Sequence, residues 1–157
     1  MKLYLVQHAK AKSKEEDPDR SLSAEGYADI RKVAAFVAKQ ANMNVHQIFH
    51  SGKARARQTA EVLGEALQPA NGVQPASGLK ALDDPADWAG RLVDMNGEII
   101  LVGHKPYLPR LAALLICQDT ETTVVDFAMG GVVCLVRDPE DHWSVRWMVT
   151  PDIVAID

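Results

Sequence analysis

Two histidines that follow short apolar runs are the residues of this sequence best suited to chemistry. His8 follows Lys2–Gln7 (KLYLVQ), and His104 follows Ile99–Gly103 (IILVG). The unperturbed pKa of histidine is about 6.5, so a neutral imidazole can act as a nucleophile or a hydrogen-bonding group near neutral pH. We expect each apolar run to be a strand that brings one imidazole to its end.

A cationic segment lies between the two histidines. Residues 51–60 (SGKARARQTA) open a helical pattern, which places Arg55 in the first helical turn, four residues after Ser51. There its guanidinium could bind two phosphate oxygens, and the N–H groups of the helix N-terminus would add to the attraction. His104 could donate a hydrogen bond to a phosphoryl oxygen as charge builds up in a transition state. Two histidines with an arginine therefore indicate phosphoryl transfer.

Each of these residues also has an ordinary structural interpretation. A histidine after a strand can be a hydrogen-bonded residue at a sheet edge, and an arginine early in a helix can be solvated, as we expect for Arg57. The remaining histidines, His46, His50 and His142, lack comparable settings. We expect them to be surface or packing residues, so only the combination of sites favours chemistry.

The size and charge of the chain limit the classes of protein. With 157 residues, 47% of them apolar, it is long enough for one domain over residues 1–157 and too short for two ordinary ones. A formal net charge of −4 argues against a nucleic-acid binder with a broad basic surface, but it allows a small cationic pocket. We see no signal peptide and no run long enough to cross a bilayer, and expect a cytoplasmic protein that does not bind membranes.

The two cysteines have no partners at the spacing of a metal site. Cys117 and Cys134 both stand in apolar surroundings. We expect two buried, reduced thiols without a catalytic or metal-binding role.

Strand and helix patterns alternate in the first two thirds of the chain. A polar loop, Lys10 to Arg20, follows the first strand, and Pro69 to Pro75 is a connection rich in helix breakers. Strands are predicted over residues 2–6, 47–50 and 98–102. Four helices are predicted. The first runs from a cap at Ser23 to about Asn42, and the second covers residues 54–67. The third begins after a cap at Asp84, with Pro85 in the first position, and the fourth covers residues 106–117.

The last third of the sequence changes character. Strands are predicted over residues 122–127, 132–137 and 143–149, separated by turn-forming residues. The whole pattern predicts an α/β fold, a three-layer α/β/α sandwich with a mostly parallel central sheet and an antiparallel edge. In such folds ligands bind at the carboxyl ends of the strands, where both histidines are expected.

The order of these motifs resembles the histidine phosphatase superfamily, the phosphoglycerate-mutase-like enzymes in which a histidine is transiently phosphorylated. The short length and residues 7–11 (QHAKA), 19–26 (DRSLSAEG) and 127–131 (FAMGG) are similar to the SixA-type phosphohistidine phosphatases. This resemblance spans nearly the whole chain. It implies removal of phosphate from a protein phosphohistidine, in phosphorelay signalling, without a metal or an organic cofactor.

The resemblance also implies roles for individual residues. His8 would be the nucleophile that takes the phosphoryl group, and Arg55 and His104 would clamp the phosphate. Arg20 matches a family arginine near the mouth of the pocket. The substrate-binding residues that we expect are Gln7, Arg20 and Ser51.

One departure from the family pattern is immediately next to the nucleophile. Family members usually carry arginine before this histidine, where this chain has Gln7. A neutral amide donates hydrogen bonds but cannot neutralise a dianion. The difference between charge-assisted and neutral bonds, about 1–1.5 kcal/mol, corresponds to roughly a five- to twelvefold change in affinity. The lysines that could compensate are Lys10, Lys12, Lys53 and Lys105.

A second departure concerns the proton donor. Members that cleave phosphate esters carry a glutamate where this sequence has Ala81. An alkoxide leaving group needs that proton, whereas the imidazole released from phosphohistidine can take a proton from solvent. The missing glutamate therefore favours phosphohistidine over alkyl phosphates, although Asp83 or Asp84 could substitute for it.

Two other functions are compatible with the sequence. Gln7 and Ala81 fit a module that binds phosphate or a phosphoprotein and has lost most turnover. A small-molecule phosphomonoesterase would require Asp83 or Asp84 to act as the acid, and Asp84 also fits a helix cap.

Overall fold

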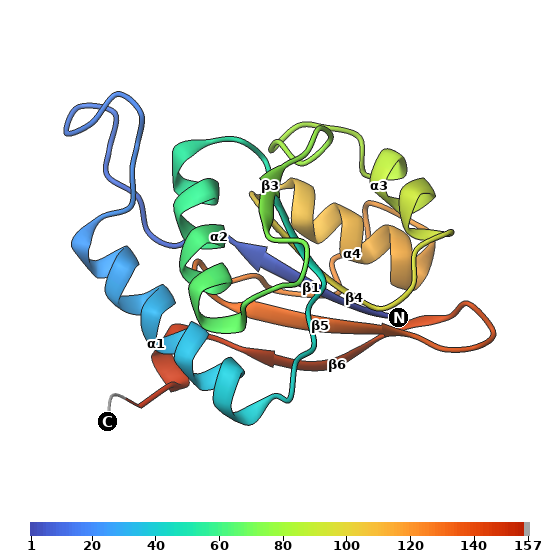
Figure 1. Cartoon of the computed structure of the whole chain (residues 1–157). Coiled ribbons are helices and arrows are strands. Elements are labelled where there is room, and N and C mark those ends of the chain that lie inside the picture. Colours follow the sequence, from blue (N-terminus) through green and yellow to red (C-terminus); the bar gives the residue numbers. More distant parts are fainter. Residues whose placement is uncertain (156–157) are drawn as a thin grey trace.

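The computed structural model describes residues 1–155, in which six strands form one mixed sheet flanked by four helices (Figure 1). The sheet order is β3-β2-β4-β1-β5-β6. The strands are β1 Lys2–Gln7, β2 Gln47–His50, β3 Val73–Pro75, β4 Glu98–Gly103, β5 Val132–Arg137 and β6 Trp143–Val149. The helices are α1 Ala24–Gln40, α2 Ala54–Leu67, α3 Pro85–Leu92, α4 Tyr107–Cys117 and the short 3-10 helix η1 Pro151–Ile153.

Strands β1 to β4 are parallel to one another, and β5 and β6 form the antiparallel edge. This arrangement confirms the predicted mostly parallel sheet. Within residues 1–155, no helix combines the length and the apolar character that crossing a membrane requires.

Alternating side chains of β1 enter two separate hydrophobic cores. Tyr4 and Val6 pack with apolar residues of α1 and α2, whereas Leu3 and Leu5 pack with residues of α3 and α4. Figure 1 shows these helix pairs beside the sheet. Burying one such leucine contributes about 1.5–3 kcal/mol. A strand covered on both faces needs apolar residues at every position, which explains the continuous apolar run in the sequence.

The register between β1 and β4 fixes the positions of the two histidines. Val6 pairs with Val102 and Gln7 with Gly103, and the His8 N–H donates to the Gly103 carbonyl over 3.0 Å. The two parallel strands therefore end together. His8 and His104 leave the sheet at the same edge, as the sequence predicted.

The start of α1 is tied to the segment that follows His8. Ser23 caps the helix by accepting a bond of 3.0 Å from the Gly26 N–H, and its own N–H donates to the Lys10 carbonyl over 3.0 Å. A Cβ on Gly26 would lie 2.0 Å from the Lys10 carbonyl oxygen. The helix approaches the backbone this closely because position 26 has no side chain.

Residues 122–127, predicted as a strand, form no strand in the structure. Val125 and Phe127 are buried against α3 and α4, while Thr122, Thr123 and Val124 are exposed. The alternating pattern thus arises from an irregular segment that packs on a helical layer. Both edges of β5 are already paired, with β1 and with β6.

Three smaller expectations also need correction. The connection over residues 69–75 contains β3, which pairs with β2. Helix α4 begins at Tyr107, and Pro106 occupies the cap position before it. Cys134 is buried as expected, but Cys117 is exposed because it is the last residue of α4.

Replacing Gly26 by alanine should lower the free energy of unfolding by about 1–3 kcal/mol, because the new methyl group overlaps the Lys10 carbonyl and the helix must move. Urea denaturation followed by circular dichroism measures the change. Gly90→Ala in α3 is the matched control, since its added Cβ meets nothing within 4 Å beyond its own helix in the described chain, and alanine favours helices. Equal effects of the two substitutions would contradict the close contact at Gly26.

Candidate active site

The His8 imidazole is held by the backbone of the next residue. Its side chain is buried, and Nδ1 lies 2.7 Å from the Ala9 carbonyl oxygen. A carbonyl oxygen only accepts hydrogen bonds, so this contact places the ring proton on Nδ1. Nε2 then carries the free electron pair, which makes it the nucleophilic atom of the ring.

The segment that contains His8 is anchored to α2. The Ala9 N–H donates to Thr59 Oγ1 over 3.0 Å, and Thr59 Oγ1 donates to the Arg55 carbonyl over 2.7 Å. Thr59 was not among the site residues predicted from the sequence. Its signal is a polar residue on the inward side of an amphipathic helix, one turn after Arg55. Through Thr59, the helix that carries the arginine also positions the histidine.

Ser51 contacts the second histidine. Its Oγ lies 2.6 Å from His104 Nε2 and accepts a bond of 3.3 Å from the Lys53 N–H. With that N–H as its donor, the Ser51 hydroxyl can give its own proton to Nε2, which leaves the His104 ring proton on Nδ1. This Nδ1 is buried and has no hydrogen-bond partner among residues 1–155. The arrangement leaves a donor available for a ligand.

The two imidazoles lie next to each other. Their ring centroids are 5.1 Å apart and their planes are inclined by 53°. The structure thus brings together His8 and His104, as predicted, with Ser51 in direct contact with His104.

Two arginines without acidic partners lie near the histidine pair. Neither Arg20 nor Arg55 has a carboxylate within 4.0 Å in the described part of the chain. Arg55 is half-buried and its Nε has no partner, and Arg20 donates from Nε to the Lys12 carbonyl over 3.1 Å. Guanidinium groups without carboxylate partners are available to bind the oxygens of an anion. Their arrangement is typical of a site that binds an anion.

The environment keeps both imidazoles neutral. Burial lowers the pKa of His8, and the charges of Arg55 and Arg20 lower it further, against the opposing effect of the bond to Ala9. Burial, followed by the charges of His8 and Arg55, lowers the pKa of His104 to about 3. A bound dianion would reverse part of this effect, because a nearby negative charge favours the protonated ring.

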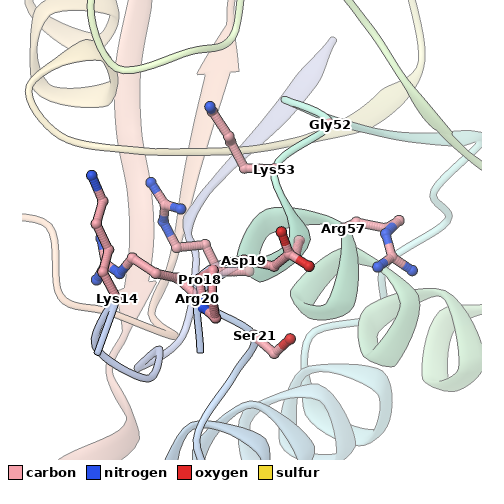
Figure 2. A pocket seen from close by; sticks show the side chains of 10 residues that line it. Lys14, Pro18, Asp19, Arg20, Ser21, Gly52, Lys53 and Arg57 are labelled. Atoms are coloured by element: carbon pink, nitrogen blue, oxygen red, sulfur yellow. The ribbon is translucent and has the colours of Figure 1, made fainter. Parts of the chain in front are cut away.

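An open cleft of about 740 Å³ is lined by Arg20, the residue expected near the mouth of the pocket. Figure 2 shows that its lining side chains come from the loop before α1 and from the start of α2. Arg20 and Arg55 line it, whereas His8 and His104 do not. Arg55 links this cleft to the His8 segment, because Thr59 bonds both the Arg55 carbonyl and the Ala9 N–H.

Gln7 is buried at the end of β1 and only 8% exposed. Its backbone carbonyl accepts a bond of 2.9 Å from the Gly130 N–H, but its side-chain Oε1 has no partner among the described residues. The structure therefore leaves an unsatisfied amide oxygen directly beside the nucleophile candidate.

The compensating lysines differ in their surroundings. Lys10 pairs with Glu25 at 2.6 Å and Lys105 with Asp126 at 3.8 Å. Within residues 1–155, Lys12 and Lys53 have no carboxylate within 4.0 Å, and Lys53 lines the cleft. Lys53 is thus the lysine best placed to compensate for the glutamine.

The two aspartates considered as proton donors are both bound to nearby backbone. Asp83 Oδ2 accepts from the Lys80 N–H over 2.8 Å, and Asp84 Oδ1 accepts from the Ala86 N–H over 3.0 Å as the cap of α3. These local hydrogen bonds give both aspartates a structural role.

The remaining histidines have the structural settings that the sequence predicted. His50 is buried, and its Nδ1 accepts a bond of 3.1 Å from the Gly52 N–H in the turn between β2 and α2. His46 and His142 are exposed.

A family model described as "Histidine phosphatase superfamily (branch 1)" matches residues 3–98 of the chain. This segment includes His8, Arg20, Ser51 and Arg55. The comparison with curated proteins gives no match.

Solved structures resemble the chain over nearly its full length. The protein histidine phosphatase SixA, complexed with tungstate, has a TM-score of 0.84 at 20% identity, covering 97% of this chain and 98% of that one. A protein from Agrobacterium tumefaciens assigned as a SixA phosphohistidine phosphatase has a TM-score of 0.75 at 23% identity, covering 96% and 97%. A phosphoserine phosphatase from Entamoeba histolytica has 0.70 at 15%, covering 96% and 97%. The likeness confirms the predicted phosphoglycerate-mutase-like fold.

The lowered pKa values predict how stability depends on pH. Below about pH 6.5 the unfolded chain binds protons at His8 and His104 that the folded chain does not bind. The free energy of unfolding should therefore be greatest above about pH 6.5 and fall as the pH is lowered toward 3, the pKa of His104.

Urea denaturation between about pH 7 and 4.5 avoids most carboxylate titration and measures this slope. His104→Asn should make the slope shallower without removing it, because the pKa values of His8 and His50 are also lowered. His142→Gln, at an exposed position outside the site, is the control. A slope that His104→Asn does not alter would contradict the assigned cause.

Proposed function

Because the chain belongs to the histidine phosphatase superfamily, we propose that it removes phosphate from protein phosphohistidine through an intermediate on His8. The observation that carries this proposal is a neutral imidazole with a free Nε2, next to two guanidinium groups that have no acidic partner in the described chain. We place the substrate, a phosphorylated protein of a signalling phosphorelay, in the cytoplasm.

In the first step, Arg55 and Arg20 bind the oxygens of the phosphoryl group and His8 Nε2 attacks phosphorus. A new P–N bond forms at His8 while the P–N bond of the substrate breaks, and the substrate imidazole leaves with the bonding electron pair. A proton from solvent or one already on its ring makes it a neutral leaving group. In the second step, water attacks phosphorus, inorganic phosphate leaves, and the electron pair returns to His8 Nε2.

His104 would stabilise the charge that develops on the phosphoryl oxygens. Its buried Nδ1 is a donor without a partner among residues 1–155, and Ser51 holds the opposite side of the ring. A donor fixed in advance costs little reorganisation when the charge appears, which is why such groups contribute strongly to catalysis. Ser51 then acts by positioning His104.

The surroundings of the residues considered as replacements for the missing glutamate favour a nitrogen-linked substrate. Asp83 and Asp84 are both engaged by backbone N–H groups, and Ala81 offers no proton. An ester substrate would have to expel an alkoxide without this help. The phosphoserine phosphatase of the same fold supports a second candidate function, the hydrolysis of a small-molecule phosphate ester. The neutral Gln7, where family members usually carry arginine, favours a third, a phosphate-binding module with little turnover.

Replacing His8 by alanine should abolish the release of phosphate from phosphoramidate, because the nucleophile is lost. Purified wild type should release phosphate from phosphoramidate much faster than from p-nitrophenyl phosphate, measured as inorganic phosphate. The matched control is His50→Ala, another buried histidine, at the end of β2, which should retain most activity.

The outcomes distinguish the three functions. Wild-type activity in a folded His8→Ala variant would rule out the proposed nucleophile. Faster release from the ester would favour the small-molecule phosphatase. Oxyanion binding without release from either substrate would favour the binding module.

Replacing Gln7 by arginine should strengthen inhibition by vanadate or tungstate about five- to twelvefold, because a charge-assisted bond replaces a neutral one. Tungstate is bound by the SixA structure of the same fold. Gln7→Met, which has a similar size and no charge, is the control and should weaken inhibition slightly. No gain in a folded Gln7→Arg variant would mean that position 7 does not reach the anion.

A further inference from the structure

The cleft at the mouth of the proposed site carries more positive charge than one phosphoryl group requires. Its lining holds five cationic side chains and a single carboxylate, Asp19, in a chain whose formal net charge is −4. The five cations are Lys14, Arg20, Lys53, Arg55 and Arg57. A phosphoryl group brings about −1.5 to −2 charges, which Arg20 and Arg55 alone can balance.

The three remaining cations form an outer rim, namely Lys14, Lys53 and Arg57. In the described chain, Lys14 and Lys53 have no carboxylate within 4.0 Å. Arg57 contacts Glu61 at 3.0 Å, but both side chains are about half exposed, and such pairs contribute only about 0–1 kcal/mol. The rim can therefore bind another anionic partner with little loss of free energy, because only the weak Arg57–Glu61 pair would be given up.

The rim has the character of a protein-docking surface. All three side chains are exposed and lie on two elements, Lys14 on the loop before α1 and the other two at the start of α2 (Figure 2). Small-molecule sites instead enclose their ligand with fixed and mostly apolar groups. Long exposed cations around an open cleft are suited to attracting an extended acidic surface.

We propose that the outer rim binds acidic residues that flank the phosphohistidine of the substrate protein, and so selects phosphohistidines that lie on acidic surfaces. This inference rests on the proposed phosphatase function and adds the chemistry of the partner. Contacts at an exposed charged rim act mainly on the association rate and weaken as salt is added.

The test uses two synthetic phosphohistidine peptides that differ only in flanking residues, glutamate in one and glutamine in the other. Wild type should hydrolyse the glutamate peptide with a kcat/KM about tenfold higher at an ionic strength of about 0.01 M, and about equally at 0.5 M. Lys14→Gln/Arg57→Gln should reduce the low-salt preference to within about twofold and leave phosphoramidate turnover unchanged.

Lys39→Gln/Arg146→Gln is the matched control, because it removes one exposed lysine and one exposed arginine away from the cleft. It should keep the wild-type preference. Equal rates for the two peptides in wild type would overturn the proposed role of the rim and leave the phosphatase function standing. An equal loss of preference in both double variants would do the same. No release of phosphate from either peptide or from phosphoramidate would overturn the phosphatase function itself.

Discussion

The pairing of Gln7 with Gly103 at the ends of two parallel strands is the constraint on which the site depends. Because of this pairing, β1 and β4 end at the same edge of the sheet. His8 follows β1 there, and His104 follows β4. The neighbouring cores fix this register, because a shift by one residue would turn Leu3 and Leu5 toward the wrong helical layer. The packing that stabilises the sheet therefore also fixes the geometry of the imidazole pair.

Hydrogen bonding then leaves a different ring nitrogen free in each of the two histidines. The Ala9 carbonyl holds the proton of His8 on Nδ1, whereas Ser51 occupies Nε2 of His104. Burial and nearby positive charges disfavour protonation of both rings. The result is one ring with a free electron pair and one with a donor, beside two arginines that have no carboxylate partner within residues 1–155. A chain with a formal net charge of −4 thus creates a local anion site.

Much of this could be predicted from the sequence because the signals are local. The apolar run before each histidine, the Ser23 cap and the Asp84-Pro85 helix start depend on neighbouring residues, and the structure has them as predicted. The Ser51–His104 and Thr59–Ala9 contacts could not be predicted, because they join residues more than 49 positions apart. The strand prediction for residues 122–127 was wrong because burial against a helix also produces an alternating pattern.

The most direct test is to identify the phosphorylated atom of the enzyme intermediate. Protein quenched in base during turnover of phosphoramidate can be digested and sequenced by mass spectrometry, and 31P NMR distinguishes the two ring nitrogens. The hydrogen bond from Nδ1 to Ala9 predicts one phosphoryl group on His8, attached to Nε2. Phosphate on Nδ1, on His104 or on any other residue would contradict the mechanism, as would turnover in which no phosphoenzyme forms.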